Sequence, residues 1–62
     1  MRQCYKVYVS QKDSPINIFS DDYELDENML EFFNRGDNHI AETIAVFNMK
    51  NILGFEKVKV GG

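Results

Sequence analysis

Two residue types that often carry out catalysis or bind metal ions each occur once in the chain, as Cys4 and His39. Together they would give only two of the four ligands that a structural zinc ion needs. A nucleophilic cysteine also needs a base beside it, and the spacing of these two residues supplies no such pair. Cys4 is better explained as a small buried residue at the start of a strand, and His39 as an exposed loop residue. The sequence therefore predicts a protein that is not an enzyme and that has no cofactor or metal.

Carboxylates are concentrated in the middle of the chain, where six of them lie within eleven positions. They lack the regular ligand spacing and the central glycine of a calcium-binding loop. Such a ridge can be the solvated rim of a small domain, or it can attract a basic site on another protein. On the second interpretation we expect a partner with a basic patch, steered by Asp21, Asp22, Glu24 and Glu27.

The three tyrosines and five phenylalanines are more aromatic side chains than one core of this size can enclose. Apolar surface left outside a core often marks an interaction site, and aromatic anchors carry much of the binding energy of protein interfaces. We expect Tyr8 and Tyr23 to be the exposed anchors. In a nucleic-acid-binding protein such rings would stack on bases, but here only Lys57 and Lys59 form a basic pair.

The overall charge narrows the classes of partner. Ten acids against seven bases give a formal net charge of −3, which argues against a nucleic-acid partner because that binding requires a basic surface. The single cysteine excludes an internal disulfide and favours a reducing compartment. No apolar run approaches the roughly 20 residues that span a bilayer, and the amino terminus has no apolar signal-peptide core. We predict a cytoplasmic protein without a membrane partner.

A chain of 62 residues is long enough for one domain, which we place at 1–60, followed by a flexible tail at 61–62. The alternation of Tyr5, Val7 and Val9 with other residues is typical of a strand. We predict an all-β fold, a small antiparallel barrel or strongly bent sheet of five strands, similar to an SH3-like barrel. The strands would lie near 4–10, 16–20, 23–34 (bent or broken at Asp26), 43–48 and 55–60.

The alternative is an α+β fold with a helix at 38–53, which would end at Gly54 and place several apolar residues on one face. Weak helix formers such as Thr43 and Val46 favour a strand instead. That strand would pair with 30–33 and lead into a turn, or one 3₁₀ turn, before the last strand. The predicted core consists of Tyr5, Val7, Val9, Ile18, Leu30, Phe32, Ile44, Val46, Leu53, Val58 and Val60.

Self-association is a further expectation from the chain's small size. A domain this short buries only about 60% of the surface that its unfolded chain exposes. A short sheet also has edges that it cannot cover, and such edges pair readily with other strands. We therefore predict a homo-oligomer, either a homodimer or a small ring.

The tail Val60-Gly61-Gly62 resembles the carboxyl terminus of the ubiquitin-like sulfur carriers of the thiamine and molybdopterin pathways. The resemblance covers the two glycines and an amino-terminal hairpin, and it implies that the terminal carboxylate is activated as an adenylate. That fold also has a substantial helix after the first hairpin, where this chain offers only Asp26–Asn34. A frayed terminus would explain the same two glycines.

A second resemblance covers an opening hairpin, Met29–Phe33 and the segment from Ile44 to Val58, with most of the likeness in Val46–Val58. These segments look like small uncharacterised β-proteins of phages and prophages in Gram-positive bacteria. The resemblance implies an all-β domain made inside an infected cell, and several such phage proteins inhibit host machinery or antiviral defence. The expected function is stoichiometric binding and inhibition of a host or defence protein in the host cytoplasm.

An alternative partner is a small anionic signal nucleotide, sequestered between the subunits of an oligomer. Phosphate groups would require bases at that interface. The residues that would supply them are Arg2, Lys6, Lys57 or Lys59.

Overall fold

A computed structural model describes residues 2–36 and 40–59 of the chain. These residues form six strands and one short 3₁₀ turn, and all the strand pairings are antiparallel. The predicted all-β class is confirmed. The elements are β1 (Gln3–Val9), β2 (Ile16–Ser20), β3 (Asp22–Leu25), β4 (Met29–Arg35), β5 (Ala41–Asn48), the 3₁₀ turn η1 (Met49–Asn51) and β6 (Ile52–Val58).

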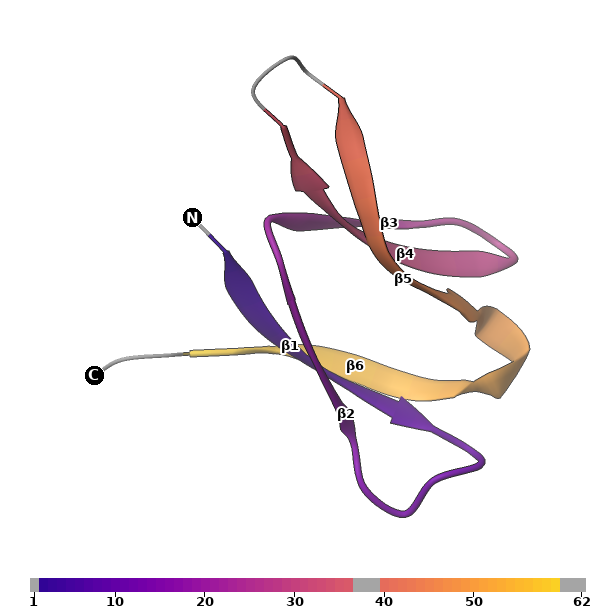
Figure 1. The fold of residues 1–62 in the computed structure, drawn as a ribbon. Coiled ribbons are helices and arrows are strands. Elements are labelled where there is room, and N and C mark those ends of the chain that lie inside the picture. The colour runs from indigo at the N-terminus through magenta and orange to yellow at the C-terminus, as the bar shows by residue number, and fades with distance from the viewer. Residues whose placement is uncertain (1, 37–39, 60–62) are drawn as a thin grey trace.

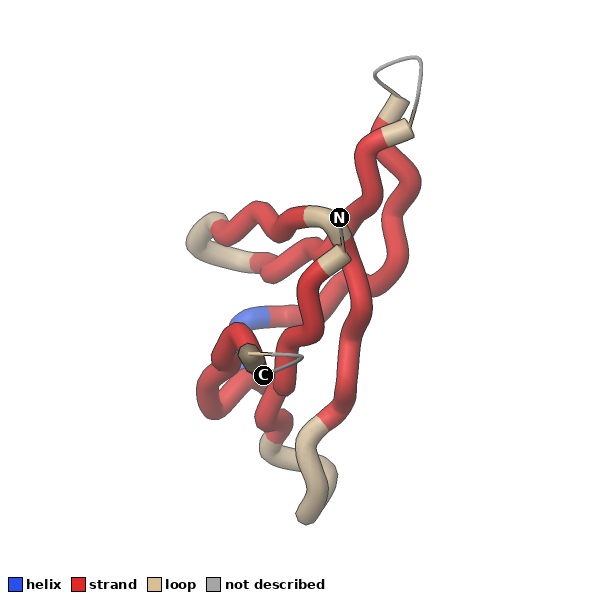
Figure 2. The backbone as a smooth tube through the Cα atoms, turned by 90° about the vertical axis from the view of Figure 1, so that its left-hand side faces the viewer, coloured by secondary structure: helices blue, strands red, loops and turns tan. Residues whose placement is uncertain are grey.

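The strands form two sheets of three, in the orders β2–β1–β6 and β3–β4–β5. Only Asp21 separates β2 from β3, so the chain passes from the first sheet to the second at this residue. Figure 1 shows the second sheet above the first, with β2 rising toward β3. Figure 2 shows that the chain returns to the first sheet at the 3₁₀ turn η1, where β6 begins. The result is a bent antiparallel assembly with its core between the sheets.

The third predicted strand, 23–34, is broken at Asp26 as expected, and its two halves are β3 and β4. The predicted 3₁₀ turn is also present, as η1. The prediction is wrong for the start of the last strand, because β6 begins at Ile52 and not near 55. The alternative helix at 38–53 is wrong, because β5 and η1 occupy most of that segment. The β-branched residues Thr43, Ile44 and Val46 pack well on a pleated surface, and β4 provides the neighbouring strand that they need.

A tight turn at residues 26–28 joins β3 to β4, and the carboxylate of Asp26 holds it. This carboxylate accepts hydrogen bonds from the backbone N–H groups of Asn28 at 2.7 Å and Met29 at 2.8 Å. The backbone N–H of Asp26 also donates to the carbonyl of Met29, at 3.0 Å. The two backbone hydrogen bonds, that from Asn28 first, lower the pKa of Asp26, because they stabilise the charged form.

Six of the predicted core residues are buried between the sheets: Tyr5, Val7, Val9, Ile18, Leu30 and Phe32. The prediction is wrong for Ile44, Val46 and Leu53, which are 40%, 51% and 74% exposed. Val58 is partly buried, and Val60 lies outside the described residues.

Register explains these three errors. Val46 lies opposite Glu31, on the face of β4 that points away from the buried Leu30 and Phe32. The pairing of β4 with β5 skips Ile44, and the pairing of β1 with β6 skips Leu53. A skipped residue marks a β-bulge, which reverses the alternation of inward and outward side chains.

An aromatic cluster joins the two sheets across the core. The ring of Phe32, on β4, lies 5.0 Å from that of Tyr5 on β1 and 6.2 Å from that of Phe55 on β6. Tyr23 on β3 extends the cluster, with its ring 5.1 Å from Phe55 and 5.5 Å from Tyr5. Several of these contacts are edge-to-face, the arrangement that aromatic quadrupoles favour.

Truncation of Leu30 should destabilise the fold far more than the same truncation at Leu53. Leu30 has no exposed surface, and Leu→Ala in a core costs about 2–5 kcal/mol. That is a large part of the roughly 3–9 kcal/mol expected for a domain of this size. Leu53→Ala should cost less than about 0.5 kcal/mol, because the side chain is mostly solvated. Urea denaturation at low micromolar protein, followed by circular dichroism, measures both; equal losses would contradict this assignment of the core.

The stability that Asp26 contributes should depend on pH. Its folded-state pKa lies below the ordinary value of 3.8, so the contribution is complete above the unfolded-state pKa and is lost as pH falls through the folded-state value. Asp26→Ala should therefore lower Tm at neutral pH, and its difference from the native chain should shrink in acid. Asp26→Asn keeps an acceptor oxygen and should retain more of the turn. A difference in Tm that does not change with pH would contradict the role of the charge.

Candidate functional site

The outward face of the second sheet carries a hollow of about 190 Å³. Met29 and Val46 provide its apolar surface, and they are 48% and 51% exposed. Glu24, Asp26 and Glu31 provide its carboxylates. The hollow is therefore an apolar patch bordered by negative charge.

Strand alternation explains why these residues share one face. On β4, Leu30 and Phe32 point into the core, so Glu31 between them points outward. The register places Glu31 opposite Glu24 on one side and opposite Val46 on the other. Directly opposite residues of antiparallel strands lie on the same face of the sheet. Glu24 on β3, Glu31 on β4 and Val46 on β5 thus form a row across the outward face of the sheet.

The two opposed carboxylates of Glu24 and Glu31 make this face negatively charged. Like charges directly opposite each other on neighbouring strands are destabilising. Glu31 is held in place by the hydroxyl of Thr43, which donates a hydrogen bond to its carboxylate at 2.5 Å. A cationic group bound between the two carboxylates would relieve their repulsion. The arrangement favours a ligand that carries positive charge.

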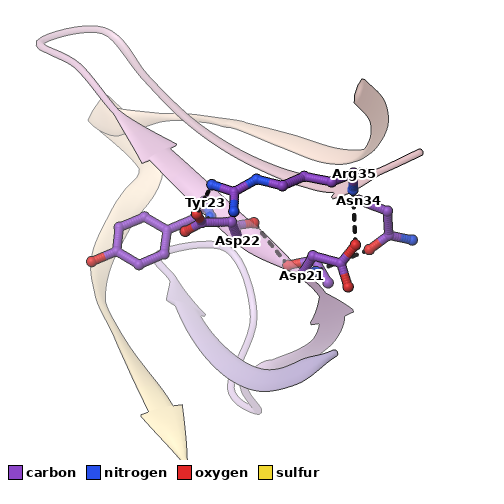
Figure 3. Close-up of polar contacts among 6 residues, drawn as sticks. Asp21, Asp22, Tyr23, Asn34 and Arg35 are labelled. Atoms are coloured by element: carbon purple, nitrogen blue, oxygen red, sulfur yellow. Dashed lines mark hydrogen bonds and ion pairs between the residues drawn. The ribbon is translucent and has the colours of Figure 1, made fainter. Parts of the chain in front are cut away.

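Asp21 and Asp22, two of the four predicted steering acids, are engaged in contacts that hold the corner between the sheets (Figure 3). The Asp21 carboxylate accepts from the backbone N–H of Arg35 at 2.8 Å, and the Asp21 N–H donates to the side-chain oxygen of Asn34 at 2.9 Å. The Asp22 carboxylate pairs with the Arg35 guanidinium at 2.5 Å and accepts from the N–H of Tyr23 at 2.8 Å. Their contacts fasten the start of β3 to the end of β4.

The other two predicted acids, Glu24 and Glu27, are exposed. Glu24 lines the hollow, whereas Glu27 lies in the turn that follows β3. Both carboxylates therefore face solvent on the second sheet, and Glu24 is the one that the structure places beside apolar surface.

The two predicted aromatic anchors lie in different environments. Tyr8 is on β1, and its hydroxyl donates to the Glu56 carboxylate at 3.0 Å, a contact that raises the pKa of Tyr8. Tyr23 lies opposite the buried Phe32 and belongs to the aromatic cluster, although 40% of it is exposed. Burial, with a smaller effect of the Asp22 carboxylate, raises the pKa of its neighbour Tyr5. The structure does not bring Tyr8 and Tyr23 together in one surface patch.

The bases proposed for an anionic nucleotide are also separated. Lys6 lies opposite Glu56, and Lys57 lies opposite the buried Tyr5. Residues 56 and 57 are adjacent on one strand, so Lys6 and Lys57 are on opposite faces of the first sheet. Within one copy of the chain these two bases do not form a common site.

The single cysteine is a buried thiol, whereas His39, Gly61 and Gly62 lie outside the described residues. Within residues 2–36 and 40–59, the structure contains no group of three or more His, Cys, Asp or Glu side chains arranged to hold a metal ion. In the same part of the chain, β3 and β4 follow the first hairpin, where the ubiquitin-like sulfur carriers have a helix.

The sequence pattern pointed to the acidic segment but missed the apolar half of the site. The alternation pattern places Val46 in the core and gives Met29 no role at the surface. The alternation of β4 indicates the outward position of Met29, because a strand that buries Leu30 and Phe32 must point Met29 and Glu31 outward. The partner of Glu31 on β5 could be identified only from the register.

Comparison with known protein families, with characterised proteins and with solved structures gives no match for this chain. In the part of the chain that the structure describes, no helix is long and apolar enough to span a membrane. Function therefore has to be inferred from the geometry of the chain itself, and its distinguishing feature is the acidic and apolar hollow of the second sheet.

Proposed function

We propose that the protein is a non-catalytic binding protein whose outward face on the second sheet docks a basic, partly apolar segment of another protein. The observation that carries this proposal is the row Glu24, Glu31, Val46, in which two opposed carboxylates lie beside exposed apolar surface. A lysine or arginine of the partner would lie between the carboxylates. An aliphatic side chain next to it would cover Met29 and Val46.

Each part of the face supplies a different component of binding. Negative charge steers a basic partner toward the surface and raises the association rate. Desolvation of the apolar residues supplies affinity, at about 25 cal/mol for each Å² of apolar surface removed from water. Steering by exposed carboxylates should weaken as salt rises, because the screening length falls to about 8 Å at physiological ionic strength.

In its narrower form, the proposal is that the protein acts as a phage-encoded inhibitor. It would bind a host or anti-phage defence protein in a stoichiometric complex and cover a functional basic site. This form rests on the resemblance of Val46–Val58 to small phage β-proteins, and the acidic hollow is compatible with it. The partner's site would be one that normally binds an anion or an acidic protein, since such sites are basic.

A basic peptide of alternating lysine and valine provides a direct test of the face. We expect it to shift the amide resonances of Glu24, Met29, Glu31 and Val46 in a nitrogen–proton NMR titration. The double variant Glu24→Lys/Glu31→Lys should weaken its binding by about tenfold or more, because each exposed ion pair contributes up to about 1 kcal/mol and reversal adds repulsion. Binding of the native chain should also weaken as salt is added.

The matched control is Asp13→Lys/Glu56→Lys, which makes the same change in net charge within the first sheet. It should leave binding of the peptide nearly unchanged. Equal weakening by the two double variants would show that net charge, and not this face, attracts the peptide. Affinity capture from a bacterial lysate with the native chain and with Glu24→Lys/Glu31→Lys would then identify the partners that depend on the face.

A further inference from the structure

Charge is divided unevenly between the two sheets. The segments that build the first sheet and its connections, 2–20 and 52–59, contain five bases and two acids, a net charge of +3. The segments 21–36 and 40–51 contain seven acids and two bases, a net charge of −5. One end of the molecule is therefore basic and the other acidic, so the basic end of one copy complements the acidic end of another.

Two strand edges are available for contact between copies. Among the residues that the structure describes, β5 pairs only with β4 and β6 pairs only with β1, so each has an edge without a paired strand. These open strands also expose apolar side chains, Ile44 and Val46 on β5 and Leu53 on β6. Unpaired edges with exposed apolar residues readily add another strand.

The other two outer strands are better protected. β3 is only four residues long and carries the charges of Asp22 and Glu24, and short, charged edges resist pairing. β2 is five residues long and follows Pro15, which has no backbone N–H to donate. By contrast, β5 is eight residues long, and Glu42 is its only charged residue. β5 is thus the least protected edge of the second sheet.

We propose that β5 of one copy pairs antiparallel with β6 of a second copy, in a head-to-tail contact between the acidic and the basic sheet. Full overlap of the two strands sets the register, with residue 41 opposite 58 and residue 47 opposite 52. That register places Glu42 opposite Lys57 and Phe47 opposite Ile52, while the bulged residues Ile44 and Leu53 have no directly opposite partner. The contact thus contains an opposite-charge pair and an apolar pair, and both kinds of cross-strand pair are stabilising.

The contact joins two different edges, so each copy has one of each kind still free. A contact of this type closes into a ring when the rotation between copies permits, and otherwise extends into a chain. This inference does not depend on the proposed function, because the acidic hollow lies on the outward face of the second sheet and the contact uses its edge.

Disulfide cross-linking tests the register. A mixture of Ala41→Cys chains with Val58→Cys chains, treated with oxidised glutathione, should give a covalent dimer between positions 41 and 58, since directly opposite residues lie within disulfide range. Ala41→Cys alone and the native chain, whose Cys4 is buried, should remain uncross-linked. Cross-linking of Ala41→Cys with itself would place β5 beside a second β5 and overturn the proposal. No cross-linking in the mixture would also overturn it.

Exchange of the charges at positions 42 and 57 tests whether Glu42 of one copy pairs with Lys57 of the next. Sedimentation from low micromolar to millimolar protein should show assembly of the native chain, and Glu42→Lys or Lys57→Glu should each weaken it by about tenfold. The combined variant Glu42→Lys/Lys57→Glu should restore assembly, whereas Asp13→Lys should leave it intact. A native chain that stays monomeric throughout, or a combined variant no better than the single ones, would overturn the proposal.

The same variants separate this inference from the proposed function. Glu42→Lys should lose assembly but still bind the lysine–valine peptide, since Glu42 does not line the hollow. Glu24→Lys/Glu31→Lys should lose the peptide and still assemble, although more weakly than the native chain, because it changes the net charge of the second-sheet segments from −5 to −1. If Glu42→Lys lost both activities, the edge and the face would act as one site, and the head-to-tail contact as a separate surface would be wrong.

Discussion

The packing of Phe32 against Tyr5 is the contact on which the two-sheet arrangement depends. Neither sheet has enough residues to form a core by itself, and a three-stranded sheet needs another layer against its apolar face. Phe32 belongs to the second sheet and Tyr5 to the first, and both are almost fully buried. Their rings, 5.0 Å apart, stand at the centre of an aromatic cluster that takes residues from both layers.

The sharp passage from β2 to β3 makes this packing possible. A chain that continued straight after Ser20 would extend the first sheet, and the second sheet would have no route across the core. Instead, Asp21 contacts Asn34 and Arg35, and Asp22 pairs with Arg35, so the start of β3 is tied to the end of β4. The acidic residues of the corner therefore contribute to the fold, and they differ in this from Glu24 farther along β3 and from Glu27 in the turn.

Each sheet packs one face into the core, and this determines which side chains the opposite face exposes to solvent. Because Leu30 and Phe32 point inward, Met29 and Glu31 point outward, next to Glu24 on β3 and Val46 on β5. The resulting face combines opposed carboxylates with exposed apolar side chains, and the proposed binding function rests on this combination. The edges of β5 and β6 are a separate surface, because an outer strand of a sheet uses its backbone hydrogen-bonding groups on one side only.

Local pattern was sufficient for the all-β class of this protein, for the break at Asp26 and for the buried row Tyr5, Val7 and Val9. These features depend on alternation and turn chemistry within a few residues, and they are encoded where they occur.

The positions of Ile44, Val46 and Leu53 were decided by tertiary structure. Two β-bulges and the pairing of β4 with β5 set which way these side chains point, and a shift of one residue reverses the face of every side chain that follows. The same holds for the candidate site. The sequence by itself determined that acids cluster between Asp21 and Glu31, whereas only the register brought Glu24 and Glu31 beside Val46, because a partner across a sheet is chosen by strand pairing and not by nearness along the chain.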